Sequence, residues 1–559
     1  MSHFDSALKK AMPRQNRGSR RWVLVLWDQL SGELGPLGGL EPGEAGIVLL
    51  ESGEWLRRRP WHKQRIALIL ANQRHFALEQ ARRGVAVRYV RSDLPPAKAL
   101  LLVARELGPL LAMEPAEREL RAELAPLREK KLLSFSPHTG WLTTRQQFEK
   151  GAGSRPPWRM DAFYRHLRRE TGILMKDGKP LGGQYSLDAE NREPWRGSPT
   201  PPEFPGFPTS RIKEEVCKAV ERDLTDHPGA LDPASLPATA QDAQALWEWA
   251  KSECLTHFGT YEDAMSTRSS GLFHTRVSSL LNIHRLLPEK LLQETLELDI
   301  PLNSKEGFVR QLLGWREFVK HVHDATDGLR NLDGKEQTTA TTPGDAGYAR
   351  WAGRKWKAPK PPPGVDGGSL ASVLGADEPL PTAFWGTPSG MNCLDTVVRS
   401  VWDTGWSHHI TRLMVLSNIA ALLDVSPREL TDWFWVAYTD AWDWVVEPNV
   451  LGMGTFAVGE VFTTKPYIAG SAYLDRMSDY CKSCRFSPKT NCPLKRLYWA
   501  YLQRHEKALS SNRRLLPVLR SLQKRKASDR RLDARTWEWA QRTLRDGGEL
   551  TPEDAVGPE

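Results

Sequence analysis

The stretch Trp22-Val-Leu-Val-Leu-Trp-Asp28 is followed by two more short apolar runs, GIVLL at residues 46–50 and AVRYV at residues 86–90. Between the second and third runs, a helical pattern extends from about His62 to Arg83. Short buried strands that alternate with helices are typical of a parallel α/β sheet. We therefore predict a doubly wound parallel-sheet domain over residues 22–150.

The pattern changes on either side of this domain. Residues 1–21 are expected to form a basic, flexible leader. Residues 151–238 are rich in Pro, Gly and charge, and their length predicts an ordered, functional connector. From residue 239 to 510 the helical period dominates and predicts a mostly α-helical second domain, interrupted by a Gly/Pro-rich insertion at 324–385. Residues 511–559 are expected to form a charged helical tail.

Composition limits the class of protein. Of 559 residues, 26% are charged and 40% are hydrophobic, which is typical of a globular protein. No apolar run approaches the roughly 18 residues of a membrane span, and the N-terminus lacks the apolar core of a secretory signal. We therefore expect a cytoplasmic protein, acting as a monomer. Lys and Arg number 77 against 68 Asp and Glu, and this modest excess favours a polyanionic partner.

Tryptophan is unusually frequent, with 22 in the chain. Seven of them lie close together in the second half: Trp385, Trp402, Trp406, Trp433, Trp435, Trp442 and Trp444. A Trp-rich core, stacking on a flat ligand and electron hopping between rings are all compatible with this cluster.

The strongest local signal is a set of cysteines. Cys481-Lys-Ser-Cys484 is followed by Cys492, and three thiolates within twelve residues indicate a metal or cluster site. Cys393 is the natural fourth ligand, because the two remaining cysteines lie outside this part of the chain. The spacing fits a structural zinc and a [4Fe-4S] cluster equally well, and unrelated buried cysteines are the alternative.

A second signal is the segment His408-His409-Ile-Thr-Arg412. Adjacent side chains on a helix point about 100° apart, so the two histidines cannot both face one ligand squarely. One of them could donate a proton near neutral pH while the other packs or orients it. Arg412 lies one turn further and could contact the same anionic group. The alternative is a helix with two structural histidines.

Basic residues interleaved with aromatic ones suit a phosphate backbone and exposed bases. The segment RMDAFYRHLRRETG, residues 159–172, has this pattern, and its cations are Arg159, Arg165, Arg168 and Arg169. A second such cluster lies within the insertion, at residues 349–363. A solvated basic helix is the alternative for the first.

Together these segments resemble the photolyase/cryptochrome superfamily, and within it the iron–sulfur bacterial branch of prokaryotic (6-4) photolyases. The resemblance extends from about Trp22 to Asn512. It is carried by DQL (28–30), QRHFA (73–77), FYRHLRRETGILM (163–175), DAENREP (188–194), EGFVRQLLGWREF (306–318), MNC (391–393), HHITRLM (408–414), DAW (440–442), EPN (447–449), TKPY (464–467) and RMSDYCKSC (476–484).

The resemblance implies a connector that approaches DNA and a helical domain that binds FAD. It implies light-driven repair of (6-4) pyrimidine photoproducts, in which reduced FAD donates an electron and a histidine assists proton transfer to the lesion. UV-damaged DNA would then be the partner. Two alternatives remain, a cryptochrome-like blue-light photoreceptor without repair activity and a non-photochemical iron–sulfur protein that binds nucleic acid.

The resemblance also implies roles for single residues. The four cysteines would hold a [4Fe-4S] cluster, and His409 would be the proton donor. His408, Arg412 and Tyr467 would line the lesion pocket, and Trp385 and Trp433 would belong to the electron-transfer chain that recharges the flavin. The expected FAD-binding residues are His274, Thr275, Ser278, Gln311, Trp315, Arg316, Asp440, Trp442 and Asn449.

The chain departs from the pattern of this branch at several positions. Phe434 replaces the usual Tyr beside Trp433, and Val446 stands where the branch has an acidic residue near the flavin, with Glu447 one place later. The family sometimes carries an antenna chromophore, of the 6,7-dimethyl-8-ribityllumazine type in this branch. Typical residues of that site are replaced here by Trp55, Trp61 and Gln73.

Overall fold

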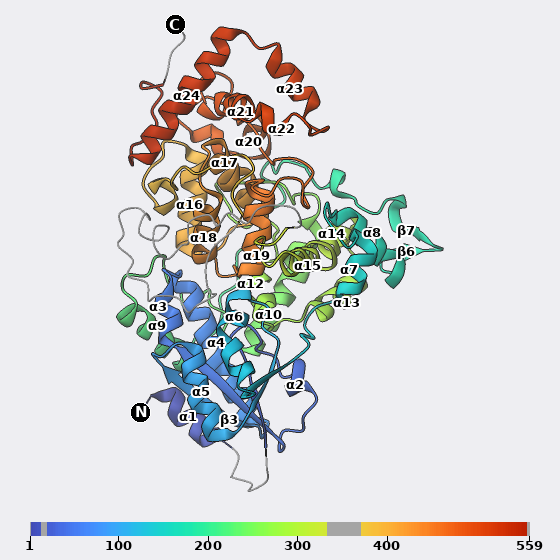
Figure 1. The fold of residues 1–559 in the computed structure, drawn as a ribbon, viewed down its shortest axis with the longest axis vertical. Helices are drawn as coiled ribbons and strands as arrows, with labels where there is room; N and C mark the ends of the chain where they lie inside the picture. Colours follow the sequence, from blue (N-terminus) through green and yellow to red (C-terminus); the bar gives the residue numbers. More distant parts are fainter. Residues whose placement is uncertain (1, 13–19, 333–369, 556–559) are drawn as a thin grey trace.

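The computed structural model describes residues 2–12, 20–332 and 370–555. Its N-terminal part is built on five parallel strands in the order β3-β2-β1-β4-β5 (Figure 1). The strands are β1 (Arg21–Leu24), β2 (Ala45–Ser52), β3 (Ala86–Ser92), β4 (Leu110–Met113) and β5 (Leu133–Ser136). The structure therefore confirms the predicted doubly wound α/β sheet.

Burial on both faces explains why these runs are strands. In β2, the side chains of Ile47, Val48 and Leu49 are completely buried, as expected for a parallel strand covered on both sides. The principal helices of this part are α4 (Lys63–Arg82), α5 (Pro96–Leu107) and α6 (Arg118–Glu129). The sheet thus forms a continuous core with its helices.

The strand order reverses beside β1, where sheets of this kind usually leave a crevice at the carboxyl edge. Here the helical part of the chain closes that crevice. The backbone N–H of Leu30 donates to the carbonyl of Ile283 at 2.9 Å, and Nδ1 of His284 lies 2.6 Å from the carbonyl oxygen of Asp28. The edge of the sheet therefore serves as a contact between the two parts of the chain.

The N-terminal segment differs from the expected flexible leader. Residues His3–Ala11 form helix α1, which begins with a capping box between Ser2 and Asp5. Phe4 is completely buried, and Asp5 pairs with Arg91 at 2.9 Å. Leu8 and Met12 pack against the same core, so this short amphipathic helix is docked on the sheet domain.

After β5 the described chain is mostly helical, with one short hairpin of β6 (Met175–Lys176) and β7 (Lys179–Pro180), and the helical prediction for residues 239–510 is confirmed. Its longer elements are α7 (Arg145–Ala152), α8 (Met160–Thr171), α9 (Arg211–Asp223), α10 (Ala240–Trp249), α13 (Pro288–Glu297), α14 (Leu302–Val309), α15 (Glu317–Ala325), α16 (Asn392–Thr404), α18 (Pro427–Ala437) and α21 (Pro493–Arg504). Among the described residues no helix is both long and apolar enough to cross a membrane.

The C-terminal segment is packed onto the rest. It forms α23 (Leu516–Gln523) and α24 (Ala527–Arg545), and α24 lies against α21 at the top of Figure 1. Trp539 and Leu544 of α24 are buried. The predicted helices are therefore present, but they belong to the folded body. Most of the insertion, including the basic-aromatic cluster at 349–363, lies outside the described residues.

Candidate active site

The helical part encloses a cavity of about 1190 Å³. This exceeds the roughly 300–1,000 Å³ of ordinary small-molecule pockets, so the space suits a large cofactor together with a second ligand. Most of the residues that the sequence singled out line it: Arg159, Arg165, His274, Thr275, Ser278, Gln311, Trp315, Arg316, His408, His409, Arg412, Asp440, Asn449 and Tyr467.

Three walls of the cavity are π-helical. These segments are η4 (Arg310–Arg316), η7 (Thr411–Ser417) and η8 (Glu447–Gly454). A π-helical turn inserts an extra residue and rotates the following side chains, and such turns are frequent at functional sites. The wider turns therefore help to place Arg316, Arg412 and Asn449 on the cavity surface.

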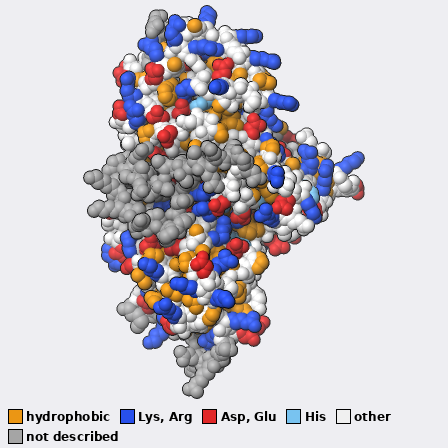
Figure 2. Space-filling view, in the orientation of Figure 1, with side chains coloured by type: hydrophobic (Ala, Val, Ile, Leu, Met, Phe, Trp, Pro, Cys, Tyr) orange, Lys and Arg blue, Asp and Glu red, His pale blue; other side chains and the backbone are white. Residues whose placement is uncertain are grey.

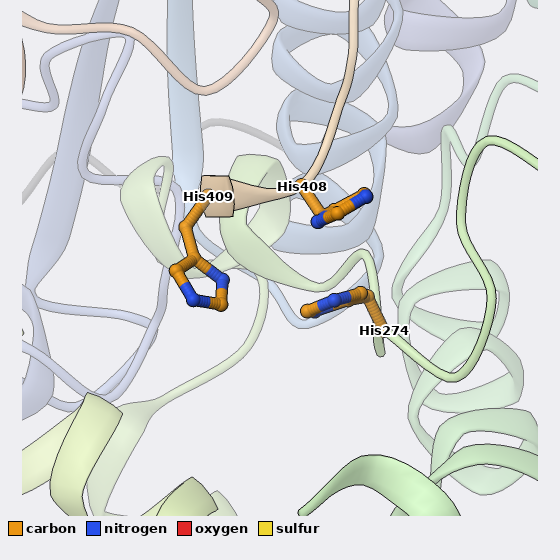
Figure 3. Close-up of side chains that lie close together, drawn as sticks. All are labelled: His274, His408 and His409. Carbon is orange, nitrogen blue, oxygen red and sulfur yellow. The ribbon is translucent and has the colours of Figure 1, made fainter. Parts of the chain in front are cut away.

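Three imidazoles meet on one wall (Figure 3). The rings of His274 and His408 are nearly parallel, 13° apart, with centroids 4.5 Å from each other. His409 lies edge-on to His274 at 5.5 Å, and one nitrogen from each of the three rings falls within 4.8 Å of the others. Because imidazole lone pairs lie in the ring plane, two stacked rings do not point at a common metal ion. The arrangement favours proton handling over metal binding.

The three histidines differ in burial and therefore in charge. Burial, together with the neighbouring imidazoles and Arg412, holds the pKa values of His274 and His408 well below the usual range, so both are neutral. His409 has a side chain that is 44% exposed, and its Nε2 lies 3.7 Å from Oδ1 of Asp263. The carboxylate can form an ion pair with a protonated imidazole. His409 is therefore the member of the cluster that borders the cavity and also lies beside a carboxylate.

An ion pair closes another side of the cavity. Arg412 donates to both carboxylate oxygens of Asp440, at 3.0 and 2.9 Å, and Ser278 donates to the same carboxylate at 2.6 Å. The guanidinium also lies 4.1 Å from the ring centroid of Tyr438. Bidentate geometry of this kind fixes both side chains. Arg412 is thus held in place by Asp440.

Arg316 is an unpaired cation on the cavity wall. None of its three guanidinium nitrogens has a hydrogen-bond partner among the described residues, although the group is buried. Desolvation lowers its pKa to about 10, so it remains charged at neutral pH. It lies over the rings of Trp141 and Trp444, at 4.5 and 5.0 Å. A buried cation without a hydrogen-bond partner among the described residues fits a negatively charged ligand, as a dinucleotide cofactor would be.

Val446 stands where an acidic residue was expected, and the position of Glu447 shows whether that next residue can take its place. Val446 lines the cavity. Glu447 is completely buried and accepts hydrogen bonds from Arg330 and Arg428, with His323 Nε2 2.9 Å away. Those partners hold the pKa of Glu447 well below its usual range. Glu447 therefore belongs to an ion network outside the cavity and does not replace the missing acid.

The four predicted metal ligands come together. Cys393, Cys481, Cys484 and Cys492 line a second small cavity whose other walls include Leu474 and Phe486. Burial raises the pKa of Cys481 to about 11 and that of Cys492 to about 12, and the sulfurs oppose one another's ionisation. Converging thiols in an apolar pocket become stable thiolates when a metal or cluster binds them. The donor set fits such a group.

A path of aromatic rings leads from the surface to the cavity. Trp385 is half-buried and stacks on Trp402 at 5.1 Å, and Trp402 meets Trp433 at 5.9 Å. Trp433 contacts Phe434 at 5.2 Å, and Phe434 lines the cavity. The structure thus places Trp402 between the two tryptophans that the resemblance singled out. Tyr438 also contacts both Trp433 and Phe434.

The predicted DNA-contacting arginines separate into two groups. Arg159 and Arg165 line the cavity, and Arg169 is exposed beside the hydroxyl of Tyr185. Arg168 is completely buried and donates to the carbonyls of Ile173, Leu174 and Tyr185. Arg168 is therefore a structural residue in this fold, because its donors are already used inside the protein.

Trp442 and the residues at the expected antenna position lie in the protein core. Trp442 is completely buried and does not line the large cavity, so the structure does not place it among the cofactor contacts. Trp55 is packed between Trp27 and Trp61, at 4.9 and 5.1 Å, and all three rings are buried. Gln73 donates to the carbonyl of Leu50. The residues that stand at the expected antenna position thus make ordinary core contacts.

The acidic surroundings of Arg310 at the cavity were not predicted from the sequence. Arg310 is buried among three carboxylates, those of Asp188, Glu262 and Glu306. Glu262 also accepts from Gln311 at 2.7 Å. Arg310 lies in the segment 306–318, which is one of those that carry the resemblance. Its partners come from distant parts of the chain, which no local pattern connects.

Comparison with known proteins identifies the family. A family model described as deoxyribodipyrimidine photo-lyase-related protein matches residues 23–236. Over 514 residues, 88% of this chain and 93% of the relative, the chain is 32% identical to the (6-4) photolyase of Agrobacterium fabrum. A shorter match, 39% identical over 69 residues, covers 12% of the chain and 56% of an uncharacterized protein of Acanthamoeba polyphaga mimivirus.

Among solved structures, the crystal structure of a bacterial class III photolyase from Agrobacterium tumefaciens superposes with a TM-score of 0.50. The match covers 95% of this chain and 99% of that one, and at 12% identity it demonstrates the fold alone. Fold and site define an enzyme that combines a parallel α/β sheet with a helical part around a cofactor-sized cavity. The chain belongs to the photolyase family, whose members use light to repair DNA.

Proposed function

We propose that this protein repairs (6-4) pyrimidine photoproducts in DNA by light-driven electron transfer from reduced FAD, with His409 as the proton donor. One observation carries the proposal. Of the three clustered imidazoles on the cavity wall, His274 and His408 are buried and neutral, and His409 is open to the cavity and paired with Asp263. The extended similarity to a protein named (6-4) photolyase supports the choice of lesion.

FAD would occupy the inner part of the cavity. Its reduced form, when bound and excited by light, supplies the electron for repair. Arg316 would face its negative charge, because that guanidinium has no partner among the described residues. Asn449 and the Arg412–Asp440 pair would border the rings, and Ser278 would help to hold the phosphate end. The apolar wall at Val446 would exclude water.

The protein's own residues would handle the proton. Nε2 of His409 faces Asp263, which leaves Nδ1 as the nitrogen that donates. His408 and Tyr467 line the same cavity and would position the damaged bases. A damaged pair must leave the stack to enter, which costs less than flipping an intact pair because its base pairing is already disturbed. Arg159 and Arg165 at the cavity would hold the DNA backbone.

We extend the proposal to the second cavity and to the aromatic path. Cys393, Cys481, Cys484 and Cys492 would hold a [4Fe-4S] cluster. The path from Trp385 through Trp402 and Trp433 would return electrons to the cofactor from outside the protein.

The test is light-dependent repair of an oligonucleotide that carries one (6-4) photoproduct, with a cyclobutane-dimer oligonucleotide in parallel. We expect repair of the first substrate. The variant His409→Ala should bind FAD normally and lose repair, and the exposed His3→Gln should behave as the parent does. Normal repair by His409→Ala would show that the proton donor is another group.

A second candidate function is a blue-light photoreceptor without repair activity. It is favoured by the apolar Val446 on the cavity wall and by Phe434 at the inner end of the aromatic path. Protein that contains FAD and iron but repairs neither oligonucleotide would make this the better proposal.

A further inference from the structure

Positive charge is concentrated at the C-terminal end of the chain. Residues 513–545 contain eleven Lys and Arg side chains and three Asp and Glu side chains, a net charge of +8. The whole chain carries +9, so the other 526 residues together carry only +1. A charge imbalance of this size within 33 residues indicates a polyanion-binding surface.

The fold places much of this charge on the protein surface. Helix α24 buries Leu532, Trp539 and Leu544 against the body of the protein. Asp533 is completely buried and forms ion pairs with Arg496 and Arg525. Lys and Arg side chains gather over α23 and α24 in Figure 2. Five of the exposed cations make no ion pair with any described residue, and we call them the C-terminal basic surface: Arg520, Lys524, Lys526, Arg531 and Arg542.

The chain connects this surface to the active-site cavity. Arg514, two residues before α23, is exposed and lines the cavity together with Lys465. Asn512 fixes this junction, because its side-chain amide donates to Glu460 and to the carbonyl of Thr464. The chain therefore leads from the cavity straight into the basic helices.

The surface also lacks the apolar centre of a protein interface. Among the large apolar side chains of α23 and α24, only Leu516 is exposed, with 38% of its surface accessible. Protein partners usually require an apolar or aromatic core within the contact. A DNA duplex requires cations alone, because it presents about one negative charge per 1.7 Å of helix axis.

We propose that the C-terminal basic surface binds the phosphates of duplex DNA flanking the nucleotide at the cavity. This inference rests on the proposed function, since it places DNA at the cavity mouth. Its contacts would be to phosphates, so they would strengthen binding without selecting a sequence or a lesion. Affinity for long duplexes should therefore depend on it more than affinity for short ones.

The test compares two full-length quadruple variants with equal loss of charge. One is Arg520→Gln, Lys524→Gln, Lys526→Gln and Arg531→Gln. The control removes four exposed cations of the α/β part, by Arg82→Gln, Lys98→Gln, Arg105→Gln and Lys130→Gln. For each protein, Kd for a long lesion-free duplex is measured across a range of salt concentrations.

For the first variant we expect the slope of log K against log salt to fall by about two to four, since each phosphate contact contributes about 0.9. The control should keep the slope of the parent. Equal slopes in all three proteins, or an equal decrease of the slope in both variants, would overturn the proposal. So would loss of binding to phosphatidylserine vesicles in the first variant with its duplex slope unchanged, because the surface would then serve a membrane.

Lesion-free DNA separates this test from the proposed function. If the parent repairs no lesion but the slopes differ as expected, the proposed function fails and the basic surface remains. If the parent repairs the lesion but the slopes are equal, the proposed function stands and the role of the basic surface in DNA binding fails. At saturating substrate the first variant should repair at the rate of the parent, because none of its substitutions lies at the cavity.

Discussion

The imidazole of His274 lies almost parallel to that of His408, with the ring centroids 4.5 Å apart. Both rings are buried, and a charge on either would be opposed by the other and by Arg412. The stacked pair is therefore a neutral platform beside His409. His409 is the exposed member of the three and borders the cavity, which is the position that the proposed lesion protonation requires.

Asp263 is expected to support repair by holding the ring of His409 in place. Asp263→Asn removes the carboxylate charge whose oxygen lies 3.7 Å from Nε2 of His409. Misplacing a catalytic group by about 1 Å can slow a reaction about 10²-fold, so we expect Asp263→Asn to repair more slowly by up to that factor, with FAD content unchanged. Asp263→Glu should restore part of the rate, and repair by Asp263→Asn at the parental rate would contradict the role.

Asp440 is expected to be essential for stability as well as for the site. Asp440→Asn leaves the buried guanidinium of Arg412 without a charged partner, and breaking a buried pair in this way costs about 3–5 kcal/mol. Chemical denaturation should show this loss. Combining the substitution with Arg412→Met should recover part of it, because no unpaired charge then remains. The exposed Asp223→Asn is the control, and equal stability of parent and Asp440→Asn would contradict the prediction.

The fold and much of the site could be predicted because their signals are local. Apolar strands alternating with helices identify the sheet, and thiols at short spacing identify Cys481, Cys484 and Cys492. The buried state of Arg168 could not be predicted, because its partners are backbone carbonyls that no sequence pattern reveals. The Asp263–His409 contact joins residues 146 positions apart. Such contacts depend on packing between elements and not on periodicity within one.

Trp402 is expected to carry electrons between the surface and the cavity. Phenylalanine is much harder to oxidise than tryptophan, so Trp402→Phe should interrupt the path between Trp385 and Trp433. A barrier increase of only about 1.4 kcal/mol already slows a step tenfold, and we expect photoreduction of bound FAD to slow by at least that factor. Repair by chemically reduced enzyme should be unchanged.

The control for this substitution is Trp249→Phe, which lies in α10 and packs against Phe204. It should photoreduce as the parent does. Photoreduction of Trp402→Phe at the parental rate would show that electrons reach the cavity by another route, for which Tyr438 is the nearest phenol beside Trp433.

Glu317 is expected to make stability depend on pH. One of its oxygens accepts from the backbone N–H groups of Leu142 and Thr143, and the other is buried without a hydrogen-bond partner among the described residues. Burial is the main cause that raises the pKa of Glu317 to about 7, while Arg316 and Thr143 act in the opposite direction. At neutral pH the carboxyl group is therefore about half protonated in the folded protein.

The sign of the effect follows from proton binding. Between about pH 4.5 and 7 the folded state holds a proton on Glu317 that the unfolded state has released, so this stabilisation is complete below pH 4.5 and is lost as the pH rises through 7. The full loss is on the order of 3 kcal/mol. Glu317→Gln keeps the neutral form at every pH, so from pH 5 to pH 8 the parent should lose more unfolding free energy than this variant by about 2–3 kcal/mol. The exposed Glu253→Gln should follow the parent at both pH values. If parent and Glu317→Gln change in parallel, Glu317 does not hold its proton in the folded state, and its buried oxygen must be satisfied by water.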